Sequence, residues 1–219
     1  MKEKVKLYAE MLFTFIVIAV IVSFSKALVS LGSNIPIKKI ITLLIPVVMA
    51  LIPMIILRIK NNKLSDLGFS RNKLTKQIMI AFGIFAITIS FVIVPLLVGI
   101  NKNDILNFKP SSTSVLVFYI IYLLIFIGFS EEFIFRGYFY KGIQSATNSE
   151  LKAVIFSSIL FGLSHYPNGH NIMQVIMTSV LGLIYGFARY KIKDCTLLSL
   201  SIAHGLHDVV ILVLSYLLL

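Results

Sequence analysis

Long apolar stretches constrain the fold of this chain more than any other feature of its sequence. About 20 apolar residues, rising 1.5 Å each, cross the hydrocarbon core of a bilayer as one helix. The composition agrees, because 58% of the 219 residues are hydrophobic, which is more than a soluble domain contains. We therefore predict an all-α, polytopic transmembrane helical bundle of about seven spans (six to eight) that forms one integral membrane domain over residues 1–219. The expected spans are Met11–Leu31, Ile40–Leu57, Ile78–Ile100, Ser114–Lys141, Leu151–His165, Ile172–Tyr190 and Thr196–Leu219.

The charge pattern argues for a membrane partner and against nucleic acid. The formal net charge is +11, from 20 Lys and Arg against 9 Asp and Glu. These basic residues lie between the apolar stretches, where they orient the chain and contact anionic lipid headgroups. Basic connections mark the cytoplasmic side, so we expect a multi-pass protein of the cell membrane with its N-terminus in the cytoplasm. The segments assigned to the cytoplasm are Met1–Lys6, Arg58–Lys76, Lys141–Lys152 and Arg189–Lys193.

Three charged residues interrupt the fourth apolar stretch past its middle. They are Glu131, Glu132 and Arg136, and each charge near a bilayer centre costs about 2.5–3.5 kcal/mol on insertion scales. Residues four apart share a helix face, so Glu132 and Arg136 are expected to pair, whereas Glu131 points about 100° away. We interpret Arg136 as the group that fixes Glu132 and leaves Glu131 free to act. The alternative is a buried pair that only sets helix register.

A second polar group ends the fifth apolar stretch. Phe161 and His165 are four residues apart and share a face, and the small residues Gly162 and Ser164 let another helix approach closely. The uncharged segment Tyr166–Asn171 is expected to form a tight loop. A histidine at a helix end is either an interface residue or a catalytic group.

A third polar group lies inside the last apolar stretch. His204 and Asp208 share a face at a spacing of four, and His207 is their neighbour. Roughly a dozen residues separate His204 from the preceding polar connection, so we expect it at a depth of about 15 Å. Ionisable residues at such depth indicate function, although a hydrogen-bonded pair that holds helices together is the alternative.

We expect Glu131, His165, His204 and Asp208 to form one polar site between the fourth, fifth and seventh helices. A carboxylate with imidazoles suits the activation of water. In that chemistry Glu131 accepts a proton from water, His165 orients the water or relays the proton, and His204 donates to a developing oxyanion. Glu131, His165 and His204 are also a possible ligand set for zinc or another divalent metal.

Together the three patterns resemble the CPBP family of intramembrane proteases, which includes the type II CAAX prenyl endopeptidases and the bacteriocin-processing, Abi-like proteins. The resemblance covers residues 114–215, and it rests on Glu-Glu-x-x-x-Arg at 131–136, Phe-x-x-x-His at 161–165 and His-x-x-x-Asp at 204–208. It implies that Glu131 and His165 activate water and that His204 and Asp208 stabilise the oxyanion. The supporting residues are then Glu132, Arg136, Phe161 and His207.

One residue departs from the family pattern, because Asp208 stands where many members have Asn. An ionised Asp accepts hydrogen bonds but donates none. Asp208 must therefore be protonated, orient His204 or bind a metal. The resemblance leaves the metal dependence open, and we expect a mechanism without a metal or another cofactor.

The predicted activity is hydrolysis of a peptide bond in a membrane-associated leader, bacteriocin or signalling peptide, in the membrane of a bacterium. The expected partners are a peptide or membrane-protein substrate and the lipid bilayer, with no nucleic acid. Two other functions stay open. One is a non-catalytic bacteriocin self-immunity protein, and the other is a proton-coupled transporter whose Glu, His and Asp carry ions.

Overall fold

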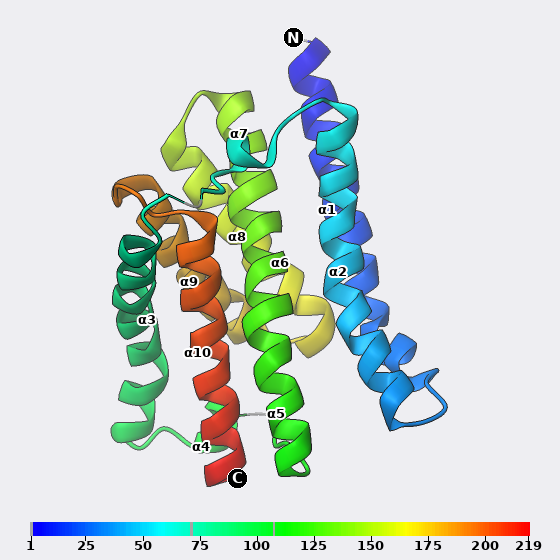
Figure 1. Ribbon diagram of the computed structural model, residues 1–219, viewed down its shortest axis with the longest axis vertical. Helices are drawn as coiled ribbons and strands as arrows, with labels where there is room; N and C mark the ends of the chain where they lie inside the picture. Colours follow the sequence, from blue (N-terminus) through cyan, green and yellow to red (C-terminus); the bar gives the residue numbers. More distant parts are fainter. Residues whose placement is uncertain (1, 71, 107) are drawn as a thin grey trace. The chain divides into compact units, whose positions relative to one another are not determined.

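The computed structural model describes residues 2–70, 72–106 and 108–219, whose regular structure is entirely helical (Figure 1). Three residues lie outside these ranges. They are Met1 in the predicted basic start, Arg71 in the second connection and Asn107 in the connection before the fourth span. The main helices are α1 (Lys2–Ser30), α2 (Ile35–Ile59), α3 (Leu74–Leu97), α5 (Thr113–Ile121), α8 (Glu150–Gly169), α9 (Ile172–Lys191) and α10 (Leu197–Leu218). Of these, α5 is the first part of a longer continuous helix, Thr113–Thr147. The shorter segments are η1 (Leu64–Leu67), α4 (Lys102–Ile105), η2 (Tyr122–Ile127), α6 (Gly128–Glu132), η3 (Phe133–Phe139) and α7 (Tyr140–Thr147).

Among the described residues, six helices are long and apolar enough to cross a membrane, and this number lies within the predicted range of six to eight. They are α1, α2, α3, the continuous helix Thr113–Thr147, α9 and α10. The predicted fifth span forms as α8, but its charged start at Glu150 and Lys152 and its polar end reduce its hydropathy below that of the other six. The chain is therefore a multi-pass membrane protein with an all-helical fold.

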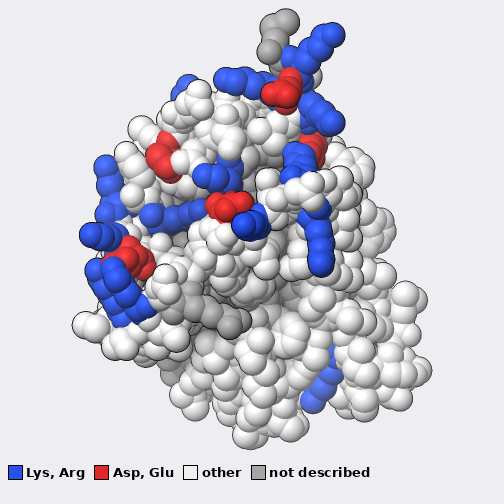
Figure 2. Space-filling view, turned by 45° about the horizontal axis from the view of Figure 1, so that its top comes forward, with Lys and Arg blue, Asp and Glu red and all other residues white. Residues whose placement is uncertain are grey.

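The outer surfaces of these helices are apolar. Phe13 is 63% exposed, Met79 is 69% exposed and Leu97 is 80% exposed. Such side chains are unfavourable in water but suited to hydrocarbon. In Figure 2 most of the Lys, Arg, Asp and Glu side chains lie in the upper part of the view, and the wide surface below them carries few charges.

The chain divides into two compact units, each built from segments that are distant in the sequence. The first unit contains Met1–Phe69 and Ser130–Lys193, and the second contains Ser70–Phe129 and Asp194–Leu219. The long helix Thr113–Thr147 passes from the second unit into the first between Phe129 and Ser130. The single integral membrane domain over 1–219 stays a prediction.

In the first unit α8 and α9 form a tightly packed helical hairpin. A Cβ atom added at Gly162 would lie 1.9 Å from Ser179 Oγ and 2.5 Å from the Val175 carbonyl oxygen. No side chain larger than hydrogen fits there without displacing α9. The predicted close approach of a helix at Gly162 is therefore confirmed.

The connection inside this hairpin is shorter than predicted. The expected loop over Tyr166–Asn171 is wrong for its first four residues, because α8 continues through Pro167 to Gly169. The helix ends at His170, whose φ of +47° is left-handed and whose N–H donates to the Tyr166 carbonyl at 2.8 Å. The side chain of Asn171 then caps the start of α9.

A polar cluster joins α1, α2 and η3 in the first unit. The carboxylate of Glu10 lies 2.5 Å from Lys60 Nζ and accepts a hydrogen bond from Tyr138 Oη at 3.0 Å. Tyr138 Oη also lies 3.2 Å from Thr14 Oγ1. These contacts hold the first two helices against the helix that carries the charged residues.

In the second unit α10 packs on α3 and on the α5–η2 helix (Figure 1). Two glycines allow the closest contacts. A Cβ atom at Gly128 would lie 2.6 Å from the Ser201 carbonyl oxygen, and one at Gly205 would lie 2.9 Å from Leu124 Cα. The backbones of the two helices therefore touch, as small residues permit inside a membrane.

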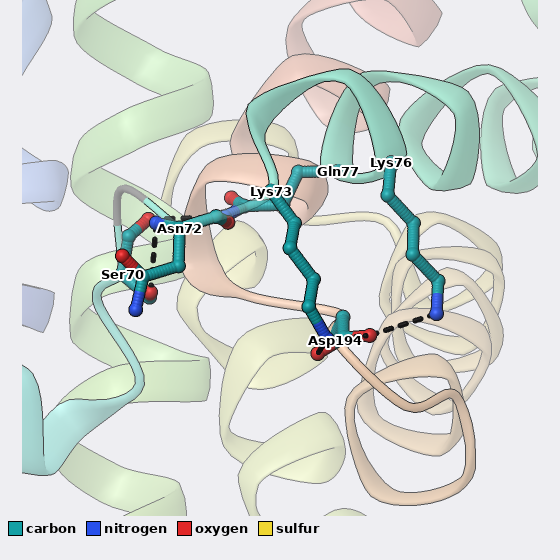
Figure 3. Close-up of polar contacts among 6 residues, drawn as sticks. All are labelled: Ser70, Asn72, Lys73, Lys76, Gln77 and Asp194. Carbon is teal, nitrogen blue, oxygen red and sulfur yellow. Dashed lines mark hydrogen bonds and ion pairs between the residues drawn. The ribbon is translucent and has the colours of Figure 1, made fainter.

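A surface ion cluster connects α3 to the segment that precedes α10 (Figure 3). Asp194 accepts hydrogen bonds from Lys76 Nζ at 2.7 Å and from Lys73 Nζ at 3.1 and 3.2 Å. The hydrogen bond from Lys76 has the largest effect and that from Lys73 the next largest, and both lower the pKa of the Asp194 carboxyl below its usual value. The ion pairs are solvent-exposed, so they contribute little to stability.

A buried amide makes a second link at the same place. Gln77 Nε2 donates to the carbonyl oxygens of Ser70 at 3.1 Å and Asn72 at 2.6 Å (Figure 3). Gln77 Oε1 accepts a hydrogen bond from Thr196 Oγ1. Because Gln77 is fully buried, losing these partners would leave polar atoms unsatisfied.

The contact at Gly128 leads to a prediction about stability. We expect Gly128→Ala to lower the free energy of unfolding by about 1–3 kcal/mol, because the added methyl group overpacks the helix contact. Gly83→Ala is the matched control, since a Cβ atom there meets nothing within 4 Å and alanine favours helix. Thermal unfolding in detergent micelles measures both. Equal stability of the two variants would contradict the proposed packing.

Candidate active site

The helix that carries the predicted carboxylates departs from regular α-helical geometry on both sides of them. Glu131 and Glu132 lie in α6, a short α-helical piece between the two π-helical segments η2 and η3. Wide π turns are rare and often occur at functional sites. These π turns were not predicted, because no residue pattern in this stretch distinguishes i→i+5 from i→i+4 hydrogen bonding.

The predicted pair between Glu132 and Arg136 is confirmed. Arg136 Nη1 donates to Glu132 Oε1 at 3.0 Å, and both side chains are fully buried. Removing two charges from water costs several kcal/mol per ion, and their attraction offsets this only in good geometry. The pair therefore places a neutralised carboxylate beside Glu131.

Aromatic rings surround the guanidinium of Arg136. Its Cζ lies 4.2 Å from the ring centroid of Phe161 in α8 and 5.3 Å from that of Tyr185 in α9. Both rings are buried, and a desolvated cation–π contact is stronger than an exposed one. Phe161 was predicted as a supporting residue. Tyr185 was missed, because nothing in the sequence of α9 shows which helix its side chain faces.

The carbonyl group of Phe161 also indicates which nitrogen of the His165 ring carries a hydrogen. The two rings meet edge to face at 4.8 Å, and His165 Nδ1 lies 2.9 Å from the Phe161 carbonyl oxygen. A carbonyl oxygen only accepts, so Nδ1 carries a hydrogen and Nε2 of the neutral ring carries a lone pair. His165 is half-buried. Its Nε2 atom is therefore suited to accept a proton or a hydrogen bond from water.

The second unit holds the other predicted group. His204 Nε2 lies 3.5 Å from Asp208 Oδ2, which confirms that the two side chains share a face of α10. His204 is 5% exposed, and His207 is buried with its Nδ1 atom making no hydrogen bond. Asp208 thus faces the imidazole of His204, where it can orient the ring.

The predicted site residues accordingly form two groups. Glu131, Glu132, Arg136, Phe161 and His165 belong to the first unit, and the contacts above join the last four of them. The second group belongs to the second unit and contains His204, His207 and Asp208 of α10. That the two groups converge between the fourth, fifth and seventh helices stays a prediction. Among the described residues, no three or more His, Cys, Asp or Glu side chains are arranged to hold a metal ion.

Comparison with known proteins agrees with the motifs. Residues 113–210 match the family model described as Type II CAAX prenyl endopeptidase Rce1-like. This range contains all three motifs and nearly coincides with the predicted core at 114–215, so the resemblance is confirmed for this region. Neither a curated protein nor a solved structure matches the chain. At the level of the family, the match supports a CAAX-type membrane protease.

The buried pair leads to a second prediction. Arg136→Met leaves the Glu132 carboxylate buried without its cation and should destabilise the fold by about 3–5 kcal/mol. Adding Glu132→Leu should restore most of that loss, because replacing both charges by apolar groups is often close to neutral. Unfolding of the two single variants and the double variant in detergent gives the coupling energy. Strictly additive effects would contradict a direct, buried pair.

Proposed function

We propose, on the premise that residues 113–210 match the Rce1-like family, that this protein is an intramembrane endopeptidase. It hydrolyses a peptide bond of a membrane-associated peptide or protein by means of a water molecule that Glu131 and His165 activate. The observation that carries the proposal is the contact between His165 Nδ1 and the Phe161 carbonyl oxygen at 2.9 Å. This contact leaves His165 Nε2 as an acceptor on a half-buried ring of α8. The carboxylate of Glu131 comes from the preceding span, where Arg136 already neutralises the neighbouring Glu132.

In the proposed first step, water attacks the carbonyl carbon of the substrate. The oxygen forms a bond to that carbon, and the carboxylate of Glu131 takes one water proton while His165 Nε2 accepts a hydrogen bond from the other O–H. The carbonyl electron pair moves to oxygen and gives a tetrahedral oxyanion. Collapse of this intermediate breaks the C–N bond, and Glu131 returns the proton to the leaving amine. General acid–base catalysis of this kind contributes about 10²–10⁴-fold.

In the proposed mechanism His204 stabilises the oxyanion by donating a hydrogen bond to it, and Asp208 is the partner of the His204 ring. An ionised Asp208 cannot donate to an oxyanion, but it lies 3.5 Å from His204 Nε2. An imidazolium donates from both ring nitrogens, so in that form His204 can hold Asp208 through Nε2 and the oxyanion through Nδ1. Asp208 therefore acts through His204 and has no direct contact with the oxyanion.

A glycine contact supports the proposed convergence of the two groups. Inside the second unit, Gly128 packs against Gly205 of α10, with a Cβ atom at Gly128 only 3.0 Å from the Gly205 nitrogen. Glu131 follows Gly128 by three residues, and His204 directly precedes Gly205. Both proposed functional residues are thus within three residues, along the chain, of two glycines that pack against each other.

The remaining parts of the proposal concern substrate, cofactor and location. The substrate is a leader, bacteriocin or signalling peptide, and the protein acts in a bacterial cell membrane with its N-terminus in the cytoplasm. We propose that the reaction uses no resident metal. Purified protein should keep its activity in the presence of a chelator.

The test is cleavage of candidate peptides, such as those encoded beside the gene, by purified protein in liposomes. Glu131→Gln should reduce kcat/KM by about 10²–10⁴-fold, because a general base is lost, while circular dichroism shows an unchanged helix content. Glu3→Gln is the matched control, since it makes the same change at an exposed position of α1 and should leave the rate unaltered. Full activity of Glu131→Gln would refute the mechanism. Cells that this variant still protects against a bacteriocin would instead indicate an immunity protein.

A further inference from the structure

We propose that α9 supplies a further part of the active site, although none of its residues belongs to the three motifs. Tyr185 and Gly182 act as positioning residues: they hold the guanidinium of Arg136, and through it the carboxylate of Glu132, in one place. The inference rests on the proposed peptidase activity, because the Glu132 carboxylate has its effect on the neighbouring Glu131. All the residues involved belong to the first unit.

The first support is how few hydrogen bonds hold this guanidinium. Arg136 Nη1 donates to Glu132 Oε1, whereas the buried Nε and Nη2 atoms make no hydrogen bond. A guanidinium has five N–H donors in a rigid fork. One hydrogen bond at one corner of that fork fixes a distance but permits rotation about it. Other contacts must therefore fix its orientation.

The second support is that rings from two different helices make these contacts. The Phe161 centroid lies 4.2 Å from Arg136 Cζ, and the Tyr185 centroid lies 5.3 Å from it. Tyr185 is completely buried, so its ring cannot swing into a solvent-filled space. α8 and α9 thus each provide one aromatic contact to the same cation.

The third support is the absence of a side chain at Gly182, one helical turn before Gly186. A Cβ atom at Gly182 would lie 3.1 Å from Arg136 Nη2 and 3.0 Å from Ser158 Cβ. A Cβ atom at Gly186 would lie 3.0 Å from Val154 Cγ1, and none of its three nearest atoms belongs to Arg136. Both glycines serve the α8–α9 contact, but only Gly182 leaves room for the guanidinium.

The cage formed by Phe161, Gly182 and Tyr185 therefore fixes the cation that pairs with Glu132. If the guanidinium rotated, Glu132 would be less neutralised and its charge would act on Glu131 through a short, poorly screened distance. Displacements of about 1 Å near reacting groups can reduce rates 10²-fold. A positioning role of this kind changes the chemical step and leaves substrate binding unaltered.

The test compares two matched pairs of variants in the liposome cleavage assay, well below their unfolding temperatures. Gly182→Ala and Tyr185→Leu should reduce kcat by about 10–100-fold with KM unchanged. Gly186→Ala, which crowds the same helix contact without touching Arg136, and Tyr185→Phe, which keeps the ring, should stay within about twofold of the unmodified protein. Equal loss in both glycine variants, or a change confined to KM, would overturn the inference.

A spectroscopic measurement tests the cage without relying on cleavage. With ¹⁵N-labelled arginine, the Nε–H resonance of Arg136, identified by its loss in Arg136→Lys, should show the ring-current shift of a proton near two aromatic faces. We expect that shift to move in Gly182→Ala and Tyr185→Leu and to persist in Gly186→Ala and Tyr185→Phe. If the unmodified protein cleaves no peptide, the proposed function fails while this resonance still decides whether the cage exists. An identical resonance in all four variants contradicts the cage.

Discussion

The buried pair between Glu132 and Arg136 is the interaction on which the rest of the site depends. Two full charges in an apolar helix are stable only if they meet in good geometry and the surrounding groups accept them. The chain meets that condition with a 3.0 Å hydrogen bond and with the ring of Phe161 over the cation. The same Phe161 contacts the ring of His165, and its carbonyl fixes the Nδ1 proton of that ring. A single phenylalanine thus connects the charge pair to the group that we assign to water activation.

Helical periodicity explains why so much of the site was predictable from the sequence. Side chains four residues apart lie on one helix face, so a motif of that spacing specifies a contact once the helix forms. Each of the three predicted pairs is confirmed, and each lies within a single helix. These pairs are Glu132 with Arg136, Phe161 with His165, and His204 with Asp208. The close approach at Gly162 was predictable for a related reason, since small residues on an apolar helix mark where another helix packs.

The features that were not predicted depend on tertiary contacts or on backbone hydrogen bonding. The π-helical turns around Glu131 change which carbonyl each N–H reaches, and side-chain patterns do not record this. Tyr185 and Gly182 contact Arg136 from another helix, so their role follows from packing and not from spacing. α8 continues past Pro167 to Gly169, although proline usually breaks helices, and it ends at His170, which has a left-handed conformation.

We propose that an acid of the fourth span and imidazoles of the fifth and seventh spans meet around one water molecule. Cross-linking of paired cysteines in a Cys195→Ser background tests it most directly. A short bifunctional thiol reagent should join Glu131→Cys to His204→Cys with a yield similar to that of the surface pair Lys73→Cys and Asp194→Cys, whose native side chains form an ion pair. The account predicts efficient linkage of the first pair in the membrane. Linkage of the reference pair alone would show that Glu131 and His204 do not share a site.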